Sequence, residues 1–158
     1  MDKKVKEFLK KMEFLFKQIE EFAKKYNLNW KYGDLEIYEE YGGRYKTKEL
    51  FVFKNGEFVF KIKPIGAYII GADGRADMIG TLDSVVLVYL EKLHFIESKI
   101  SVGTKENVIS SSKTPLYDGF KEPGWYISLE KKKIVPVNNE NICEVLEDIS
   151  EFKCSGKN

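Results

Sequence analysis

The chain has 158 residues, of which 43% are hydrophobic and 14% aromatic, a balance that predicts a folded protein and excludes a disordered or fibrous one. Its 26 Lys and Arg against 25 Asp and Glu give a net charge of +1, which supplies no overall field to attract nucleic acid or an acidic membrane. Only Arg44 and Arg75 are arginines, which also disfavours bidentate phosphate recognition, so we do not expect nucleic acid as a partner.

The first predicted element is a long amphipathic helix over about residues 3–26. Its apolar residues recur at alternating intervals of three and four, which is the spacing of one helix face. Leu9, Phe16 and Ala23 widen this stripe, and Lys and Glu occupy the opposite face. The stripe predicts packing against a sheet of the same chain, or alternatively against a partner helix.

After residue 34 the apolar residues alternate with a period of two, which is typical of strands half-covered by a core. Asn55-Gly56 and Asp73-Gly74 stand between such segments. Both dipeptides accept the positive φ values of a type I′ turn, so each predicts an antiparallel hairpin. Pro64 removes an amide donor and predicts a bend or bulge within this ladder.

Residues 85–90 form an unbroken apolar run, Val-Val-Leu-Val-Tyr-Leu. Such a run is typical of a strand that is covered on both faces. Because one helix rarely covers both faces of a sheet, the run favours self-association, and we expect a homodimer.

The remaining chain predicts a long loop over about 101–124, further strands up to residue 137 with a basic turn near Lys131, and a short helix over about 139–151. Ser, Gly and Pro are frequent in the loop, whereas Asn138 or Asn139 is suited to cap the last helix. We therefore expect one α+β domain over 1–158, with a six- to seven-stranded, mainly antiparallel meander sheet over about 34–137.

Aromatic side chains on the predicted strands are the first candidates for a binding site. Tyr and Trp combine a large apolar surface with a polar tip, and they often line ligand cavities. We select Tyr38, Tyr68, Tyr89 and Trp125 as binding residues. The alternative interpretation is that they are ordinary strand residues with high β-propensity.

A second candidate site joins Asp77 to the Glu97-Ser98-Lys99 tripeptide twenty residues later. Over residues 74–99 this pattern resembles that of the PD-(D/E)xK nucleases. The resemblance implies a divalent cation and a water held by Asp77, Glu97 and Lys99 for phosphodiester hydrolysis. The sequence departs from that family after Lys99, because residues 101–112 have no helical period.

The remaining polar residues predict no further chemistry. His94 is the only histidine, so it has no second histidine with which to share a metal. Cys143 and Cys154 are too few for a disulfide framework and do not match a zinc pattern, so they predict a reduced pair in a cytoplasmic protein. We expect no metal and no cofactor, and no stretch of about 20 apolar residues predicts a membrane span.

Taken together, these patterns favour a non-catalytic cytoplasmic binding or interaction module. Its expected partners are a second copy of the chain, another protein or a small apolar ligand. A metal-dependent nuclease-like hydrolase is the first alternative, and a carrier of a small apolar ligand beneath the tyrosine-rich strands is the second.

Overall fold

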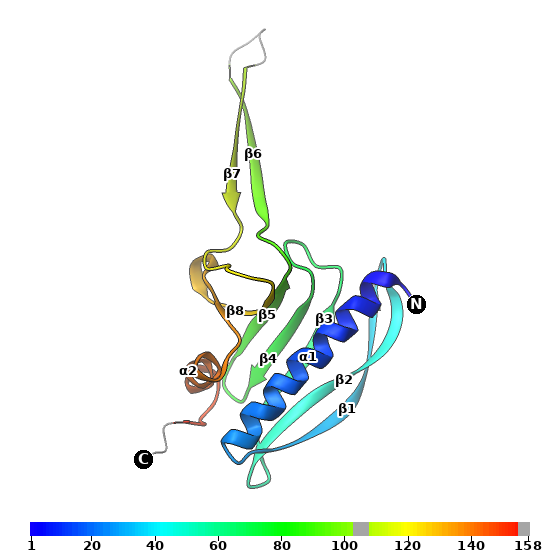
Figure 1. Ribbon diagram of the computed structural model, residues 1–158, viewed down its shortest axis with the longest axis vertical. Coiled ribbons are helices and arrows are strands. Elements are labelled where there is room, and N and C mark those ends of the chain that lie inside the picture. The colour runs from blue at the N-terminus through cyan, green and yellow to red at the C-terminus, as the bar shows by residue number, and fades with distance from the viewer. Residues whose placement is uncertain (103–107, 155–158) are drawn as a thin grey trace.

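A long helix lies along one face of a curved antiparallel sheet, and a two-stranded hairpin projects from the far end of that sheet (Figure 1). The computed structural model describes residues 1–102 and 108–154, with side chains for 1–96 and 113–154. The helices are α1 (Lys3–Lys25) and α2 (Asn139–Ile149), with a 3-10 turn at Glu130–Lys132. The strands are β1 (Asn29–Glu39), β2 (Gly43–Lys54), β3 (Glu57–Gly66), β4 (Arg75–Gly80), β5 (Ser84–Leu90), β6 (Phe95–Val102), β7 (Val108–Pro115), β8 (Gly124–Ser128) and β9 (Ile134–Pro136).

The main sheet has seven strands in the order β1-β2-β3-β4-β5-β8-β9, and every neighbouring pair is antiparallel. The meander is interrupted once, because β6 and β7 leave the sheet between β5 and β8 and pair only with each other. The predicted α+β class, with a long first helix, an antiparallel sheet and a short last helix, is confirmed. The sheet begins at Asn29, a few residues before the predicted start.

Helix α1 forms where its capping and periodicity predict it. The Asp2 carboxylate accepts a hydrogen bond from the Val5 amide at 3.1 Å, which satisfies one of the free donors at the helix start. Asn27 has a φ of 58° and ends the helix in the left-handed region. The stripe packs against the sheet through Val5, Phe8, Met12, Leu15, Phe16, Ile19, Phe22 and Ala23, all of which are buried. No helix in the described residues is long and apolar enough to cross a membrane.

The predicted hairpin at Asn55-Gly56 and the predicted irregularity at Pro64 are both present. Asn55 and Gly56 have φ values of 50° and 84°, as a type I′ turn requires, and they join β2 to β3. The register between β3 and β4 shifts between Pro64 and Gly66. This bulge bends the end of β3.

The predicted type I′ turn at Asp73-Gly74 is wrong. Neither residue has a positive φ, and the reversal between β3 and β4 takes residues 67–74, with Gly71 at a φ of 83°. Asp73 and Gly74 instead run beside β5: the Asp73 amide donates to the Tyr89 carbonyl at 2.8 Å, and the Tyr89 amide donates to the Gly74 carbonyl at 2.9 Å. The dipeptide permits a tight turn, but in the longer connection it lies beside β5 instead.

Strand β5 is covered on both faces, as its apolar run predicts, but this chain supplies both covers. Leu87 belongs to the core beneath the helices. Val88 and Leu90 belong to a second apolar cluster, formed on the other face with Tyr126 and Ile134. Partly buried side chains from the connecting segments close this cluster, namely Ile69, Tyr117 and Phe120. A second copy of the chain is therefore not needed to cover β5. The homodimer prediction depended on that need.

The predicted loop over 101–124 contains a regular strand. Residues 108–115 form β7, which pairs with β6 from Phe95↔Pro115 to Val102↔Val108. The serines in this segment lowered its apparent periodicity, although a two-stranded ribbon needs no buried face along its length. The segment from Leu116 to the start of β8 remains a connection, in agreement with the prediction.

The two cysteines form a disulfide, so the predicted reduced pair is wrong. Cys143 lies on α2, and the chain after α2 folds back until the Cα atoms of Cys143 and Cys154 are 5.7 Å apart. Phe152 anchors this tail, with its ring centroid 6.5 Å from that of Tyr26 and the Lys54 ammonium 5.5 Å above it. The spacing of 11 residues between the two cysteines did not predict that the tail folds back onto α2. The contacts that hold the tail come from distant residues, just after α1 and at the end of β2.

Reduction of this disulfide is expected to lower the free energy of unfolding by about 2–3 kcal/mol, because the bridge restricts the unfolded chain. The melting temperature should fall by roughly 5–10 °C when a reductant is added. A variant with Cys143→Ser and Cys154→Ser should melt at the lower temperature with or without reductant. Free thiols that react in the folded, unreduced protein would contradict the bridge.

Candidate functional site

A groove of about 550 Å³ with an apolar floor lies between α1 and the β1–β2 ladder. It exists because β2 leaves β3 along its first half. Pairing of β2 with β3 begins at Leu50↔Ile62, whereas pairing with β1 continues to Glu39↔Gly43. The β1–β2 ladder therefore curves along the side of α1, as Figure 1 shows, and the recess lies between the two.

The floor of this groove is apolar. Leu9, Met12 and Phe16 come from α1, and Tyr32 comes from β1. The rings of Phe16 and Tyr32 meet edge to face with their centroids 5.4 Å apart, which closes one end of the recess. Met12 is 1% exposed and Tyr32 is 37% exposed, so the floor runs from the core to solvent.

Tyr32 is held in place by its hydroxyl, which donates a hydrogen bond to the Glu20 carboxylate on α1. Partial burial, together with this bond and the nearby negative charge, raises the pKa of the Tyr32 phenol well above its usual range. Tyr32 therefore stays neutral at physiological pH and serves as a fixed apolar wall.

The rim of the groove carries charged side chains from both walls. The Lys48 ammonium lies 2.9 Å from the Asp34 carboxylate. Lys17 on α1 and Lys46 on β2 face no carboxylate within 4 Å among the described side chains. The carboxylates of Glu13 and Glu20 also line the groove, so its three lysines exceed its carboxylates by one. This excess, above an apolar floor, favours a ligand that has an apolar body and an anionic end.

Apart from the carboxylates of Glu13 and Glu20 and its three lysines, the described lining of the groove carries few reactive groups. Its lining contains neither histidine nor cysteine among the described residues, and its only aliphatic hydroxyl is that of Thr47. A hydroxyl without an adjacent base is a weak nucleophile. The arrangement is suited to binding.

Two of the predicted binding residues lie together. The ring centroids of Tyr89 and Trp125 are 5.6 Å apart in an edge-to-face contact. Trp125 is 4% exposed, and its indole N–H donates to the Lys11 carbonyl at 2.9 Å. The Lys11 ammonium lies 4.5 Å from the centre of the Tyr89 ring. Both aromatic residues thus help to seat α1 on the sheet.

The other two lie elsewhere. The Tyr68 hydroxyl donates to the Asp2 carboxylate at 2.8 Å and raises the stability of the α1 cap; this bond holds the pKa of the Asp2 carboxyl below its usual value. Tyr38 is 66% exposed on β1, with the Arg44 guanidinium 5.4 Å from its ring. Tyr68 lines a separate recess of about 380 Å³ beside α1, and none of the four predicted residues lines the larger groove.

The nuclease pattern is divided between two sheets. Asp77 lies on β4, where its carboxylate accepts two hydrogen bonds from Arg75 at 2.9 and 3.2 Å. Glu97 and Lys99 lie on β6, in the separate hairpin, and their side chains are outside the described part. No group of three metal-binding side chains occurs among the residues that the structure describes. The convergence of Asp77, Glu97 and Lys99 stays a prediction.

Sequence reasoning assigned the groove residues of α1 to the core stripe alone. Leu9 and Phe16 widen the stripe beyond a strict heptad pattern. This extra width could have indicated that part of the apolar face of α1 extends beyond its contact with the sheet. Tyr32 had no such signal, because its meeting with Phe16 depends on the curvature of β1.

Comparison of this chain with protein-family models, with curated proteins and with solved structures finds no match in any of the three. The geometry of the described residues is therefore the basis for a functional proposal.

Proposed function

We propose that this protein is a non-catalytic binding module that holds a small apolar ligand with one anionic end in the groove between α1 and β1–β2. The observation that carries the proposal is the 550 Å³ apolar-floored recess, with Lys17 and Lys46 at its rim. Recesses of several hundred cubic ångströms that are mainly apolar, with a few polar groups, are typical of small-molecule sites.

The contacts of the floor support binding over catalysis. Met12 and Phe16 are packed into the core and cannot move far without loss of stability. Tyr32 is fixed by Phe16 and Glu20. A preformed floor of this kind reduces the entropy lost when a ligand binds.

Binding of dansylated undecanoic acid, followed by dansyl fluorescence, tests this proposal. The wild-type protein is expected to bind the probe saturably. Thr47→Phe places a ring in the groove without removing a core side chain, so it should weaken binding at least about tenfold, which corresponds to about 1.4 kcal/mol. The dansylated alcohol of the same length should bind more weakly than the acid, because it has no charge for Lys17 and Lys46.

Thr81→Phe is the matched control, because Thr81 is exposed in the turn after β4 and lies outside the groove. It should bind the acid as the wild type does. Equal affinity of the wild type and Thr47→Phe, or equal losses in the two variants, would refute the site.

The other predictions from the sequence remain proposals. Self-association and a protein partner have no support from the second face of β5, which the chain itself covers. The cytoplasmic location also stays a prediction, and the Cys143–Cys154 disulfide is a feature more usual in oxidising compartments. No contact among the described residues favours the nuclease alternative over binding.

A further inference from the structure

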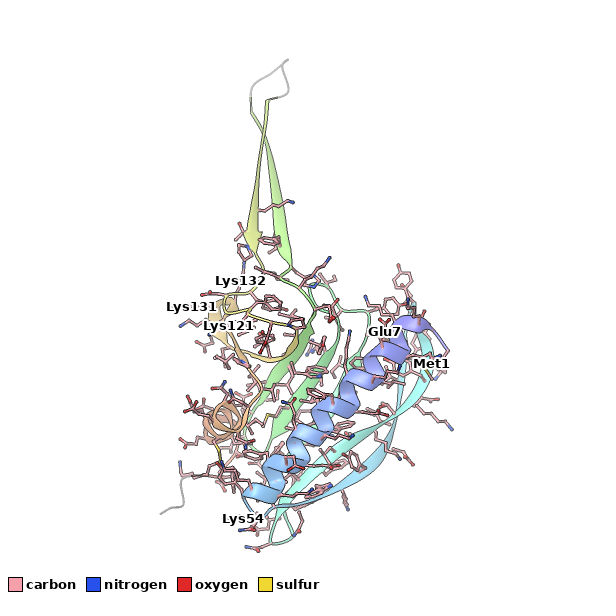
Figure 2. The ribbon with its side chains drawn as sticks, viewed as in Figure 1. Met1, Glu7, Lys54, Lys121, Lys131 and Lys132 are labelled. Atoms are coloured by element: carbon pink, nitrogen blue, oxygen red, sulfur yellow. A yellow bond between two sulfur atoms is a disulfide. The ribbon has the colours of Figure 1, made fainter. Side chains whose placement is uncertain are left out.

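The two walls of the groove run in the same direction, so a position along one wall corresponds to a position along the other. At the start of α1, the Val5 side chain lies against Gly42 in the β1–β2 turn, where an added Cβ would be 2.8 Å from it. Phe16, whose ring meets that of Tyr32, comes eleven residues after Val5, or about 16 Å further along the helix. Figure 2 shows Lys54, at the end of β2, beside the last turns of α1.

Two contacts join the walls at one end of the groove. The rings of Phe16 and Tyr32, from α1 and β1, meet with their centroids 5.4 Å apart. One turn further along α1, the Glu20 carboxylate accepts a hydrogen bond from the Tyr32 hydroxyl. The Tyr32 ring is held at two points and bridges the walls, so it blocks an apolar chain that extends along α1.

Apolar residues continue on both walls beyond the Tyr32 ring. Ala23 follows Phe16 by seven residues, which places it on the same side of α1, and it is buried. Trp30 precedes Tyr32 by two residues, which places it on the same side of β1, and it packs half-buried against the core. The ring therefore interrupts an apolar strip that would otherwise be longer.

The charges of the lining favour the opposite end of the groove for an anionic group. At the end that the rings close, the Glu20 carboxylate is negative and the Lys48 ammonium is already in an ion pair at 2.9 Å. Lys17 stands on α1 between Glu13 and Glu20, which offset its charge over the middle of the groove. Lys46, on the other wall, has no ion pair within 4 Å among the described side chains. Lys46 therefore offers the strongest contact for an anion.

The separation between Lys46 and Tyr32 sets the length of a ligand that spans them. Leu50 is the partner of Tyr32 on β2, and Lys46 is four residues from Leu50, or about 13 Å along the strand. An extended chain advances about 1.2 Å per atom, because three backbone atoms span up to about 3.6 Å. A straight chain of about ten to twelve carbon atoms therefore reaches from the ammonium group to the ring.

We propose that the ligand is a straight-chain carboxylate of about ten to twelve carbon atoms, with its carboxylate at Lys46, and that the Tyr32 ring sets the upper limit of its length. This inference rests on the proposed binding of an apolar, anionic ligand in the groove. A shorter chain leaves part of the floor in contact with water and loses affinity with each missing methylene. A longer chain must leave the floor at Tyr32, so its additional carbon atoms gain no apolar contact.

Displacement of dansylated undecanoic acid by unlabelled straight-chain acids of about 6 to 16 carbon atoms tests the inference. With the wild type, affinity should rise about fourfold per carbon atom, the value of one buried methylene, and level off near 11 carbon atoms. In Tyr32→Ala the levelling should move to about 14 carbon atoms, because the chain then continues along Trp30. Tyr32→Leu shortens the side chain less and keeps β1 apolar, so it should fold as the wild type does and move the limit by fewer carbon atoms.

Two variants of the same strand are the controls. Tyr32→Phe keeps the ring and its contact with Phe16, so it should keep the wild-type limit. Tyr38→Ala removes a tyrosine that is 66% exposed on β1 and lies outside the groove, so it should also keep the limit. Lys46→Gln should weaken the binding of each acid about threefold without moving the limit.

The results separate the length limit from the groove itself. The same limit in the wild type, Tyr32→Ala and Tyr32→Leu would overturn the inference and leave the groove as a binding site. An affinity that keeps rising in the wild type beyond about 14 carbon atoms would do the same. Equal affinities of the wild type and Lys46→Gln would overturn the placement of the carboxylate. Absence of saturable binding of the probe and of every acid would refute the proposed function and, with it, the length limit.

Discussion

Phe60→Ala is expected to lower the free energy of unfolding by about 3–5 kcal/mol, as measured by urea denaturation. Phe60 is 0% exposed at the centre of β3, and its ring meets that of Phe22 from α1 with centroids 6.4 Å apart. Alanine would leave a cavity between the helix and the sheet. Since a domain of this size is stable by about 5–15 kcal/mol, the loss would be a large part of the total.

Phe14→Ala is the control for this substitution. Phe14 is 60% exposed on the outer face of the same helix, so its loss should change the free energy of unfolding by no more than about 0.5 kcal/mol. Similar losses in the two variants would mean that α1 does not pack on the sheet through the described face.

Gly80→Ala is expected to destabilise the protein by about 3 kcal/mol. A Cβ at Gly80 would lie 2.1 Å from the carbonyl oxygen of Ile149 at the end of α2. That carbonyl also accepts the amides of Leu82 and Asp83, at 2.8 and 3.3 Å. The methyl group would therefore displace α2 from the β4–β5 turn and strain both bonds. Thermal unfolding followed by circular dichroism measures the effect.

Gly124→Ala provides the comparison within the same sheet. A Cβ at Gly124 would meet no atom within 4 Å, and its φ is not in the left-handed region. The substitution should leave the melting temperature unchanged or raise it slightly, because alanine restricts the unfolded chain. A melting temperature for Gly80→Ala equal to that of Gly124→Ala would contradict the described position of α2.

Local patterns predicted much of the fold. The periodicity between Lys3 and Lys25 predicts a helix because a helix must bury one face, and Asn55-Gly56 predicts a hairpin because both residues tolerate positive φ. Asp73-Gly74 has the same local preference and failed, because the 67–74 connection takes a longer path. The conformational preference of a dipeptide does not decide its structure where contacts elsewhere in the chain fix the course of the backbone.

The candidate sites were much less predictable. Tyr89 and Trp125 were chosen for their ring chemistry, yet Trp125 is buried under α1. The groove depends instead on where β2 stops pairing with β3. The part of β2 on the N-terminal side of Leu50 has no partner in β3. The point at which two neighbouring strands stop pairing is set by the twist and bulges of the whole sheet. No short window of sequence specifies that point.

The sequence by itself determined the class of the fold, the extent of α1 and α2 and the antiparallel neighbours of the central strands, because these depend on residues that are close along the chain. The tertiary structure alone decided two features: the groove beside Phe16 and Tyr32 and the Cys143–Cys154 bridge. Each of them joins segments whose approach depends on the curvature of the sheet and on packing between distant elements.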